Sequence, residues 1–565
     1  MLKRLIVATA LVTTPIILAL LVSSPLSAQS GDAVVLTGRV SSTAEGGMEG
    51  VVVSARRDGA NHTVSVVSDA SGVYRFPRTH LEPGMHTITS RAVGYDLVDP
   101  GPVTVAFGTT TTADLDLRET ANLGLQLSSR EWAMSLPVDD AQKTKVVHQL
   151  LSCAYCHTYQ RIMRSRHTSE RFMPVIDRMI HYYADGTAVS NDNRRGRAAR
   201  IQERGREAME EDPIWGVVPG IPRIELAEFF SSFNLSGGRT TWDFDLQTLP
   251  RPTGQATRVI ITEYDMPTAS TASHDSDIDS KGNLWYTDES AQMLGKFDSK
   301  TGQFTEYAMP PVPEGELPGT RDVVIDHNDK VWFPVRIAGG EGRLAMFDPD
   351  TEELTLAEEG ARAQFIALGP DGKIWTGFSR VDPETMTVDA RFSYQNSPNL
   401  PEGPHGGYHN VVDSRGNPYI ATYRGPGGII GVDTETGEVE WVSVPGLKAR
   451  RGKIDAQDRY WFGEYLVDKI GMFNTRTKEV QRWDLPQYST PYTASTPDKN
   501  GYVYAPSNMS ERLIRLDPGT GELIEYQMPA EFDTKKISHD PTTDRVVLWM
   551  TNMRTARVTK IEPLD

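Results

Sequence analysis

The sequence has few cysteines: among 565 residues there are two, Cys153 and Cys156. Two thiols three positions apart exclude the framework of disulfides at varied spacings that stabilises many exported proteins. Long apolar runs are also scarce, because none after residues 5–22 reaches the length that spans a bilayer. Positive charge is in deficit, with a net charge of -17. Such a field repels polyanions and argues against nucleic acid or acidic membranes as general partners.

The first 28 residues have the order of a secretion signal. Lys3 and Arg4 precede the apolar run, and small residues surround a potential cleavage point after Ala28. Pro15 and the Thr-Thr pair before it favour a removed signal over an uncleaved membrane anchor, which stays the alternative. No cysteine at the cut is available for lipidation. We therefore expect a bacterial protein that is periplasmic or otherwise exported, with membrane contact only through this segment.

Residues 32–118 are expected to form a small β-sandwich. Short stretches such as "VVLTGRVSS" and "GMHTITSRAVGYD" alternate apolar and polar residues between turn formers. The run from "GRV" through "SDASGVYRFP" resembles the carboxypeptidase regulatory-like domain, which implies an accessory module and not a peptidase. His62, His80 and His86 have no carboxylate motif around them, so we interpret them as surface or sheet residues.

Residues 120–240 change to helical periodicity. "DDAQKTKVVHQLLSCAYCH", "SERFMPVIDRMIHYYADG" and "IPRIELAEFFSSFNLSG" carry apolar residues three and four apart, which predicts three helices. Asp139 or Asp140 is suited to cap the first helix, Ser169 and Glu170 to begin the second, and Pro222 to begin the third. A Pro-containing linker over residues 241–256 follows.

Residues 257–565 are a repeat array. The phrase "DSKGNLWYTDE" recurs with a central aromatic residue, at spacings of 47, 43, 44, 42, 43 and 45 residues. A regular period with four short strands in each repeat predicts the blades of a β-propeller. The anchors are Trp285, Trp332, Trp375, Tyr419, Trp461, Tyr504 and Trp549. The third blade departs most from the pattern after its anchor.

Seven anchors predict seven blades, with the last one completed from the front of the array. The seventh repeat ends before its outer strand. The segment "RVIITEYDMP", residues 258–267, is similar in sequence to the outer strands of the other repeats. Pairing the two would close the ring and remove its exposed edges. The fold class is therefore multidomain: a β-sandwich, an all-α domain and a seven-bladed β-propeller.

The two cysteines and His157 form the spacing Cys-x-x-Cys-His. Both thiols can add to the vinyl groups of one haem while the histidine binds the iron. A dithiol redox pair or a zinc half-site fits less well, because the motif lies at a helix end and no further cysteine exists. The segment, with its closing helix "ELAEFFSSFNLS", resembles a monohaem cytochrome c, which implies one covalently attached haem c.

The sixth iron ligand is left open by the sequence. The resemblance implies a methionine in the loop before the last helix, but "EEDPIWGVVPGIP" contains none. We prefer Met179, although its helical stripe of apolar neighbours also fits ordinary core. The alternatives are Met173, Met209, His167 and His181. A basic run over residues 194–206 fits either a docking patch for an acidic redox partner or a solvated helix face.

The propeller phrases "GNLWYTDES" and "DRYWFGEYLVDKIGMFNTRTKEVQRWDLP" resemble the virginiamycin B lyase family, whose members perform a Mg²⁺-assisted C–O elimination. The family pattern has a His eleven residues before a blade anchor and a metal-binding Glu three residues after. His274 matches the first position and Glu464 the second, but no blade has both. His409 lies near the expected axis out of register. The match therefore puts lyase activity in doubt.

The sequence supports two functional hypotheses of different class. The first is a c-type haem protein with an electron-transfer role, whose propeller binds a redox partner or a small-molecule, peptide or polysaccharide ligand. The second is an enzyme that acts in the propeller channel near His274, Arg321, Tyr408 and His409, either as a lyase or as a haem-coupled oxidoreductase.

Overall fold

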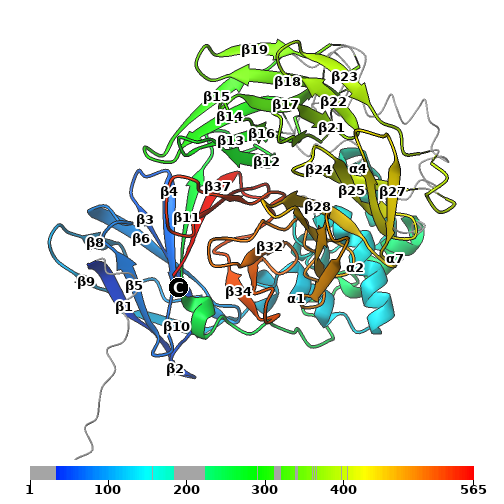
Figure 1. The fold of residues 1–565 in the computed structure, drawn as a ribbon. Helices are drawn as coiled ribbons and strands as arrows, with labels where there is room; N and C mark the ends of the chain where they lie inside the picture. The colour runs from blue at the N-terminus through cyan, green and yellow to red at the C-terminus, as the bar shows by residue number, and fades with distance from the viewer. Residues whose placement is uncertain are drawn as a thin grey trace, which may run out of the picture.

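The computed structural model describes residues 33–154, 157–183, 223–288, 291–310, 320–336, 342–358, 360–361, 363, 365–395, 397–403 and 405–564. The predicted signal segment and the basic run over residues 194–206 lie outside these residues. Figure 1 shows the strand-rich N-terminal part beside a ring of sheets, with the helices against one side of that ring. Within the described residues, no helix is long and apolar enough to cross a membrane.

The N-terminal part is a β-sandwich, as predicted. One sheet has the order β2-β1-β10-β7, and β5 and β9 also pair with β1; the strands opposite are β4, β3, β6 and β8. Alternating residues of both layers, such as Val40, Val64 and Tyr74, meet in one core. The bounds are β1 Val34–Ser42, β2 Gly46–Gly47, β3 Val52–Arg57, β4 His62–Val67, β5 Val73–Pro77, β6 Gly84–Arg91, β7 Tyr95–Leu97, β8 Val103–Val105, β9 Thr111–Thr112 and β10 Leu115–Glu119.

Six further sheets follow one another along the chain, each built from consecutive antiparallel strands. Five have four strands: β12 Ser273–Ile278, β13 Asn283–Asp288, β14 Met293–Asp298 and β15 Gln303–Ala308; β16 Val324–Ile325, β17 Val331–Arg336, β18 Gly342–Asp348 and β19 Glu353–Leu356; β20 Ala367–Leu368, β21 Ile374–Thr376, β22 Ser379–Asp382 and β23 Thr387–Arg391; β24 Gly406–Val412, β25 Pro418–Arg424, β26 Gly428–Val432 and β27 Val439–Ser443; β28 Ala449–Ile454, β29 Arg459–Glu464, β30 Lys469–Asn474 and β31 Val480–Asp484. The sixth has β32 Val503–Ser507, β33 Arg512–Leu516 and β34 Leu523–Gln527.

The last propeller sheet contains the predicted closure. β11 (Val259–Asp265) pairs antiparallel with β37 (Arg557–Pro563), next to β36 (Leu548–Asn552) and β35 (Ser538–His539). On its other edge β11 pairs with β4 of the sandwich, from Ile260↔Val66 to Tyr264↔His62. One sheet of eight strands therefore runs through both parts, an arrangement that the sequence did not indicate.

The side chains of β11 serve two cores because successive residues of a strand point to opposite faces. Ile260 packs into the sandwich core, whereas Val259 and Ile261 pack into the core of the last propeller sheet. Val52 and Val67 of the sandwich lie in that same propeller core. The sandwich is thus fixed to the ring by backbone pairing and by shared apolar packing.

The repeated Asp and aromatic residues of the blades form a hydrogen-bonded turn. In blade 1 (β12–β15), Asp279 Oδ1 accepts the backbone N–H groups of Lys281 and Asn283, and Asp279 Oδ2 accepts Trp285 Nε1–H at 3.0 Å. The same pairing joins Trp332 to Asp326, Trp461 to Asp455, Trp549 to Asp540 and, through its hydroxyl, Tyr504 to Asp498. The Asp stands six residues before its aromatic anchor in four of these five pairs and nine before it in Asp540–Trp549, so the bond explains why the repeat keeps an Asp ahead of its anchor.

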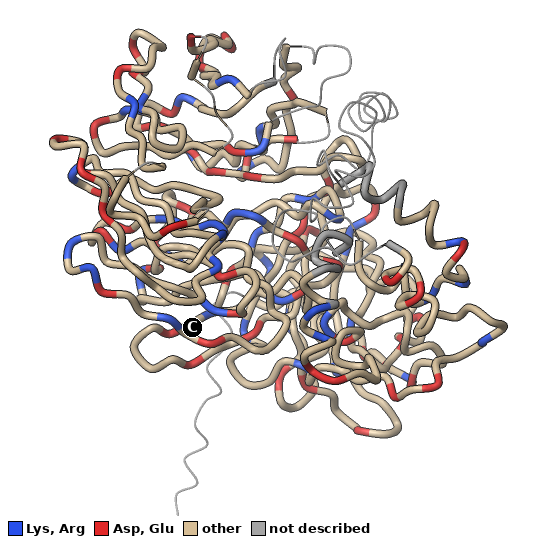
Figure 2. The backbone as a smooth tube through the Cα atoms, turned by 90° about the vertical axis from the view of Figure 1, so that its right-hand side faces the viewer, with Lys and Arg blue, Asp and Glu red and all other residues tan. Residues whose placement is uncertain are grey.

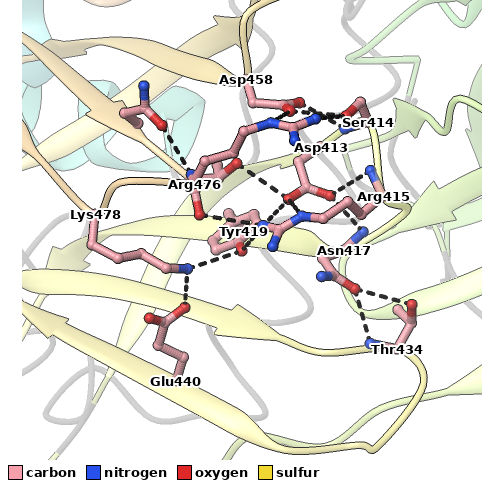
Figure 3. A network of polar contacts seen from close by, with 12 residues as sticks. Asp413, Ser414, Arg415, Asn417, Tyr419, Thr434, Glu440, Asp458, Arg476 and Lys478 are labelled. Carbon is pink, nitrogen blue, oxygen red and sulfur yellow. Dashed lines mark hydrogen bonds and ion pairs between the residues drawn. The ribbon is translucent and has the colours of Figure 1, made fainter.

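Neighbouring blades are joined through these turns (Figure 3). Asp458 in blade 5 (β28–β31) accepts the backbone N–H of Ser414 in blade 4 (β24–β27) at 2.7 Å and its hydroxyl at 2.8 Å. Asp329 of blade 2 (β16–β19) binds Ser280 of blade 1 in the same way. Both aspartates have positive φ, a conformation that costs a residue other than glycine free energy and that the carboxylate contacts offset here.

The helices lie between the two β-rich parts in sequence. α2 (Asp140–Ala154), α4 (Ser169–Tyr183) and α7 (Arg223–Phe233) are the three predicted helices, and Asp139 Oδ1 accepts the N–H of Gln142 as a cap. α1 (Ser129–Ser135), α3 (Gln160–Met163) and the short helices η1 (Leu123–Leu125) and η3 (Gly254–Thr257) were not predicted. Phe172 of α4 packs on Phe230 of α7 with ring centres 5.3 Å apart.

The third blade (β20–β23) offers a test of the turn. Gly369 stands where the other turns have Asp, and Trp375 Nε1 is buried without a hydrogen-bond partner. A Cβ at this position would lie 2.7 Å from Asp371 Oδ1 and 3.0 Å from Trp375 Nε1, a cost that any side chain shares. We therefore expect Gly369→Asp to have a free energy of unfolding about 1 kcal/mol higher than Gly369→Ala, because only the aspartate supplies the missing acceptor. Thermal unfolding measures the change, and Gly369→Ala, which adds the same Cβ without the acceptor, is the control. An equal effect of both variants would contradict the assignment.

Glu562 gives a second prediction, at the junction of sandwich and ring. Burial opposes ionisation of this β37 residue, but His80 Nε2 at 2.9 Å and Lys560 Nζ at 3.1 Å lower its pKa from 4.5 to about 2. This stabilisation is present above pH 4.5 and is lost as the pH falls through about 2, and it amounts to about 3 kcal/mol at most. Unfolding by urea between pH 5 and 2.5 should be less pH-dependent in Glu562→Gln. The exposed Glu82→Gln, whose partner is Arg57, should behave like the parent.

Candidate functional site at the propeller axis

The innermost strands bring ionisable side chains together in the middle of the ring. Asp275 comes from β12, Asp322 precedes β16, Arg451 comes from β28 and Lys536 precedes β35. All four are buried, and the two carboxylates are 0% exposed. Over the rest of the described backbone, acidic and basic residues are intermingled (Figure 2). The axis is therefore filled by a charged cluster and not by an apolar core.

Arg451 bridges two carboxylates from different blades. Its Nη1 donates to Asp275 Oδ2 at 2.5 Å and its Nη2 to Asp322 Oδ1 at 2.9 Å. Burial raises the pKa of Asp275 well above its usual range. Asp322 is buried as well, but Arg451, a hydrogen bond with His409 and Lys536 lower the pKa of that carboxyl. The cluster therefore keeps one carboxylate firmly ionised beside a second that protonates more readily.

A second group of polar residues lies beside this bridge. Asp277 accepts hydrogen bonds from Ser538 Oγ at 2.8 Å and from Lys536 Nζ at 3.0 Å. Lys453 Nζ donates to the same Ser538 hydroxyl at 3.1 Å, and burial lowers the pKa of Lys453 to about 8. Lys536 also donates to the carbonyl of Val323. Four blades are thus connected through hydrogen bonds near the axis.

Arg450, next to the bridging arginine, lies among four tyrosine rings. Its guanidinium carbon is 4.2 Å from the ring centre of Tyr408, 4.5 Å from Tyr492, 5.0 Å from Tyr465 and 5.3 Å from Tyr423. Such contacts between a cation and aromatic faces are strongest when water is excluded. Tyr492 donates its hydroxyl proton to Tyr408 at 2.7 Å. We call Arg450 and these four tyrosines the tyrosine cage.

The three candidate residues His274, His409 and Glu464 lie in different surroundings. His274 lies beside the cage, with Nδ1 3.0 Å from Asp275 Oδ1 and Nε2 3.4 Å from the Tyr492 hydroxyl. His409 Nε2 faces Asp322 Oδ2 at 3.7 Å. Glu464 ends β29, where Arg482 binds both of its oxygens at 2.7 and 2.5 Å. The structure thus connects His274 and His409 through the Arg451 bridge and holds Glu464 in a separate ion pair.

The sequence analysis missed Asp275, Asp322, Arg451 and Lys536. Their signal was present as polar residues at strand positions beside the candidates, in "HDSDI", "TRDVV", "KARRGK" and "TKKISH". Among the described residues, no group of three or more His, Cys, Asp or Glu side chains is arranged to hold a metal ion. The carboxylates at the axis are neutralised by arginine and lysine instead.

The helical segment covers the side of the ring where the tyrosine cage lies. Trp132, Tyr159 and Phe172 share one apolar cluster with Tyr465 and Tyr492. Two polar contacts fix this packing: the N–H of Arg130 donates to the carbonyl of Met509 at 2.7 Å, and His148 bonds to the backbone of Leu466. The segment that carries the Cys-x-x-Cys-His motif therefore packs against the tyrosine cage.

One ring nitrogen of His157 is held by the backbone. Its Nδ1 lies 2.9 Å from the carbonyl oxygen of Thr158, so this nitrogen carries the proton and Nε2 is left as the donor atom for a metal. Burial is the main cause of its lowered pKa, which keeps the imidazole neutral. These residues fit a haem ligand. Cys156 and Met209 lie outside the described residues, as do the side chains of Cys153, Met179 and His181.

Comparisons with known proteins agree with the two β-rich parts. Residues 253–506 match the model of the virginiamycin B lyase family, and residues 35–118 match the carboxypeptidase regulatory-like domain, so these two of the three predicted resemblances are confirmed. The resemblance of the helical segment to a monohaem cytochrome c stays a prediction. No curated protein matches the chain.

Among solved structures, virginiamycin B lyase from Staphylococcus aureus is 16% identical over 54% of this chain and 99% of its own, with a TM-score of 0.44. A streptogramin B lyase structure is 15% identical over 55% and 99%, with a TM-score of 0.45. The extracellular domain of a putative one component system from B. thetaiotaomicron is 16% identical over 52% and 39%, with a TM-score of 0.39.

The Arg451 bridge leads to a prediction about stability. Arg451→Met should lower the free energy of unfolding by about 3–5 kcal/mol, because it leaves two buried carboxylates without their shared cation. Lys469→Met, which removes the partner of the exposed Asp484, should change it by at most about 1 kcal/mol. Chemical denaturation followed by tryptophan fluorescence compares the two variants. Equal small losses would show that the bridge does not hold the blades together.

Proposed function

We propose that the chain is an exported c-type haem protein that transfers electrons and uses its propeller as a platform for a partner or substrate. The observation that carries the proposal is the position of the haem-binding motif. His157 lies in the helical segment, and this segment packs directly on the tyrosine cage. A group held there would be next to whatever binds at the axis.

The residues of the chain have distinct parts in this proposal. Cys153 and Cys156 would hold the haem through thioether bonds, and His157, whose Nδ1–H donates to the Thr158 carbonyl, would bind the iron. The haem, when bound, supplies one-electron oxidation and reduction. The apolar cluster of helices and tyrosines holds the helical segment against the ring. Met179 is proposed as the second axial ligand.

The lyase alternative draws support from the family match over residues 253–506. Its chemistry needs a base, a metal and a carboxylate within reach of one another. Here His274 is hydrogen-bonded to Asp275, while Glu464 is bound on both oxygens by Arg482. Those contacts favour a binding role for the axis over the family reaction. An enzyme that oxidises or reduces a ligand at the axis stays compatible with the haem proposal.

The visible spectrum tests the proposal. Protein exported in a host with haem-attachment machinery should show a sharp reduced α band that survives acid-acetone extraction, and Cys153→Ser with Cys156→Ser should abolish it. His157→Gln should keep covalent haem but lose the low-spin spectrum. His148→Gln, which changes another histidine near the same motif, should keep the parent spectrum. Parent protein without any haem would overturn the proposal.

A further inference from the structure

A cavity lies beside the axial cluster, between blades 3 and 4. Its volume is about 390 Å³, which is within the range of small-molecule sites. β21 contributes Thr376, and β24 contributes Tyr408, His409 and Asn410. The remaining wall is formed by Gly342, Ala363, Phe365, Gly377, Gly407 and Ile420. A Cβ built on Gly377 meets no atom within 4 Å, so the missing side chain of this glycine leaves space open.

Three residues of the wall carry polar atoms that the protein does not satisfy. Thr376 Oγ1, His409 Nδ1 and Asn410 Nδ2 are each buried without a hydrogen-bond partner. A buried polar group without a partner costs about 1–3 kcal/mol, so three in one place indicate that another molecule supplies the bonds.

The chemistry of these atoms specifies what the molecule must offer. His409 Nε2 faces the Asp322 carboxylate, which favours the proton on that nitrogen and leaves Nδ1 as an acceptor. Asn410 Nδ2 is a donor, and the Thr376 hydroxyl can do both. A hydroxyl group, which donates one bond and accepts others, satisfies this set.

The apolar residues that line the cavity favour a flat and uncharged ligand. Phe365 and Tyr408 lie with ring centres 4.3 Å apart, and Ile420 adds an aliphatic surface. None of the described residues that line the cavity is Lys, Arg, Asp or Glu. An ionic ligand would therefore lose its hydration without gaining a counter-charge in the wall, whereas an aromatic ring gains stacking contacts.

We propose that this cavity binds a neutral phenol with a single ring, its hydroxyl group bonded to His409, Asn410 and Thr376. The cavity shares Tyr408 with the tyrosine cage, whose Tyr492 packs against the helical segment. The proposal extends the proposed function by giving the class of ligand at the propeller. Binding itself does not require haem, so the two proposals can fail separately.

Isothermal titration calorimetry of the exported full chain tests the site with phenol, benzene and cyclohexanol. Phenol should bind at least about tenfold more tightly than benzene, because the hydroxyl satisfies the buried polar atoms. It should also bind more tightly than cyclohexanol, which cannot stack. Equal affinity for phenol and benzene would overturn the proposal, and so would the absence of heat with phenol, which would indicate that the cavity holds only water.

A matched pair of variants locates the binding. Thr376→Val should weaken phenol about fivefold or more and leave benzene unchanged, without loss of thermal stability, since the threonine hydroxyl has no partner in the protein. Thr287→Val is the control: this threonine is also buried with an unpartnered hydroxyl, but it lies in β13 of blade 1. An equal loss of phenol affinity in both variants would show that the site is elsewhere.

Discussion

The pairing of β11 on both of its edges is the constraint on which the architecture depends. One edge closes the ring through β37, and the other continues the sheet into β4 of the sandwich. A strand with both edges paired exposes no backbone groups to another chain. Because Val259, Ile260 and Ile261 alternate between two cores, the sandwich and the last blade cannot separate without exposing apolar side chains of both.

The ring in turn fixes the axial cluster. Among the described residues, the innermost strands of six blades lie around it (β12, β16, β20, β24, β28 and β35), and charge is balanced between blades. Arg451 does this for Asp275 and Asp322, and Lys536 for Asp277. Buried ions of this kind add little net stability relative to an apolar core, but removal of one partner is costly. The cluster therefore contributes more to determining which blades lie next to one another than to the stability of the ring.

Much of the fold could be predicted because its signals are local. The Asp-to-aromatic pairing that recurs in most blades lies within a single turn, as Asp279 and Trp285 show, and the helices begin at the residues that Asp139 and Ser169 indicated. The closure by residues 258–267 was predicted from likeness of sequence and is confirmed. The pairing of β11 with β4 has no such signal in the sequence, because any exposed strand edge offers the same backbone groups. The axial site was predicted only in part: His274 and His409 were named, but the Arg451 bridge depends on which strands face one another across the ring.

The strands that form the last blade are synthesised at different times. β4 and β11 are made early, whereas β37 follows after the other six blades. Because β4 and β11 precede β37 in the chain, β11 can pair with β4 before β37 has been synthesised. The sandwich then covers one edge of β11 and leaves the other edge free for the strand that completes the propeller.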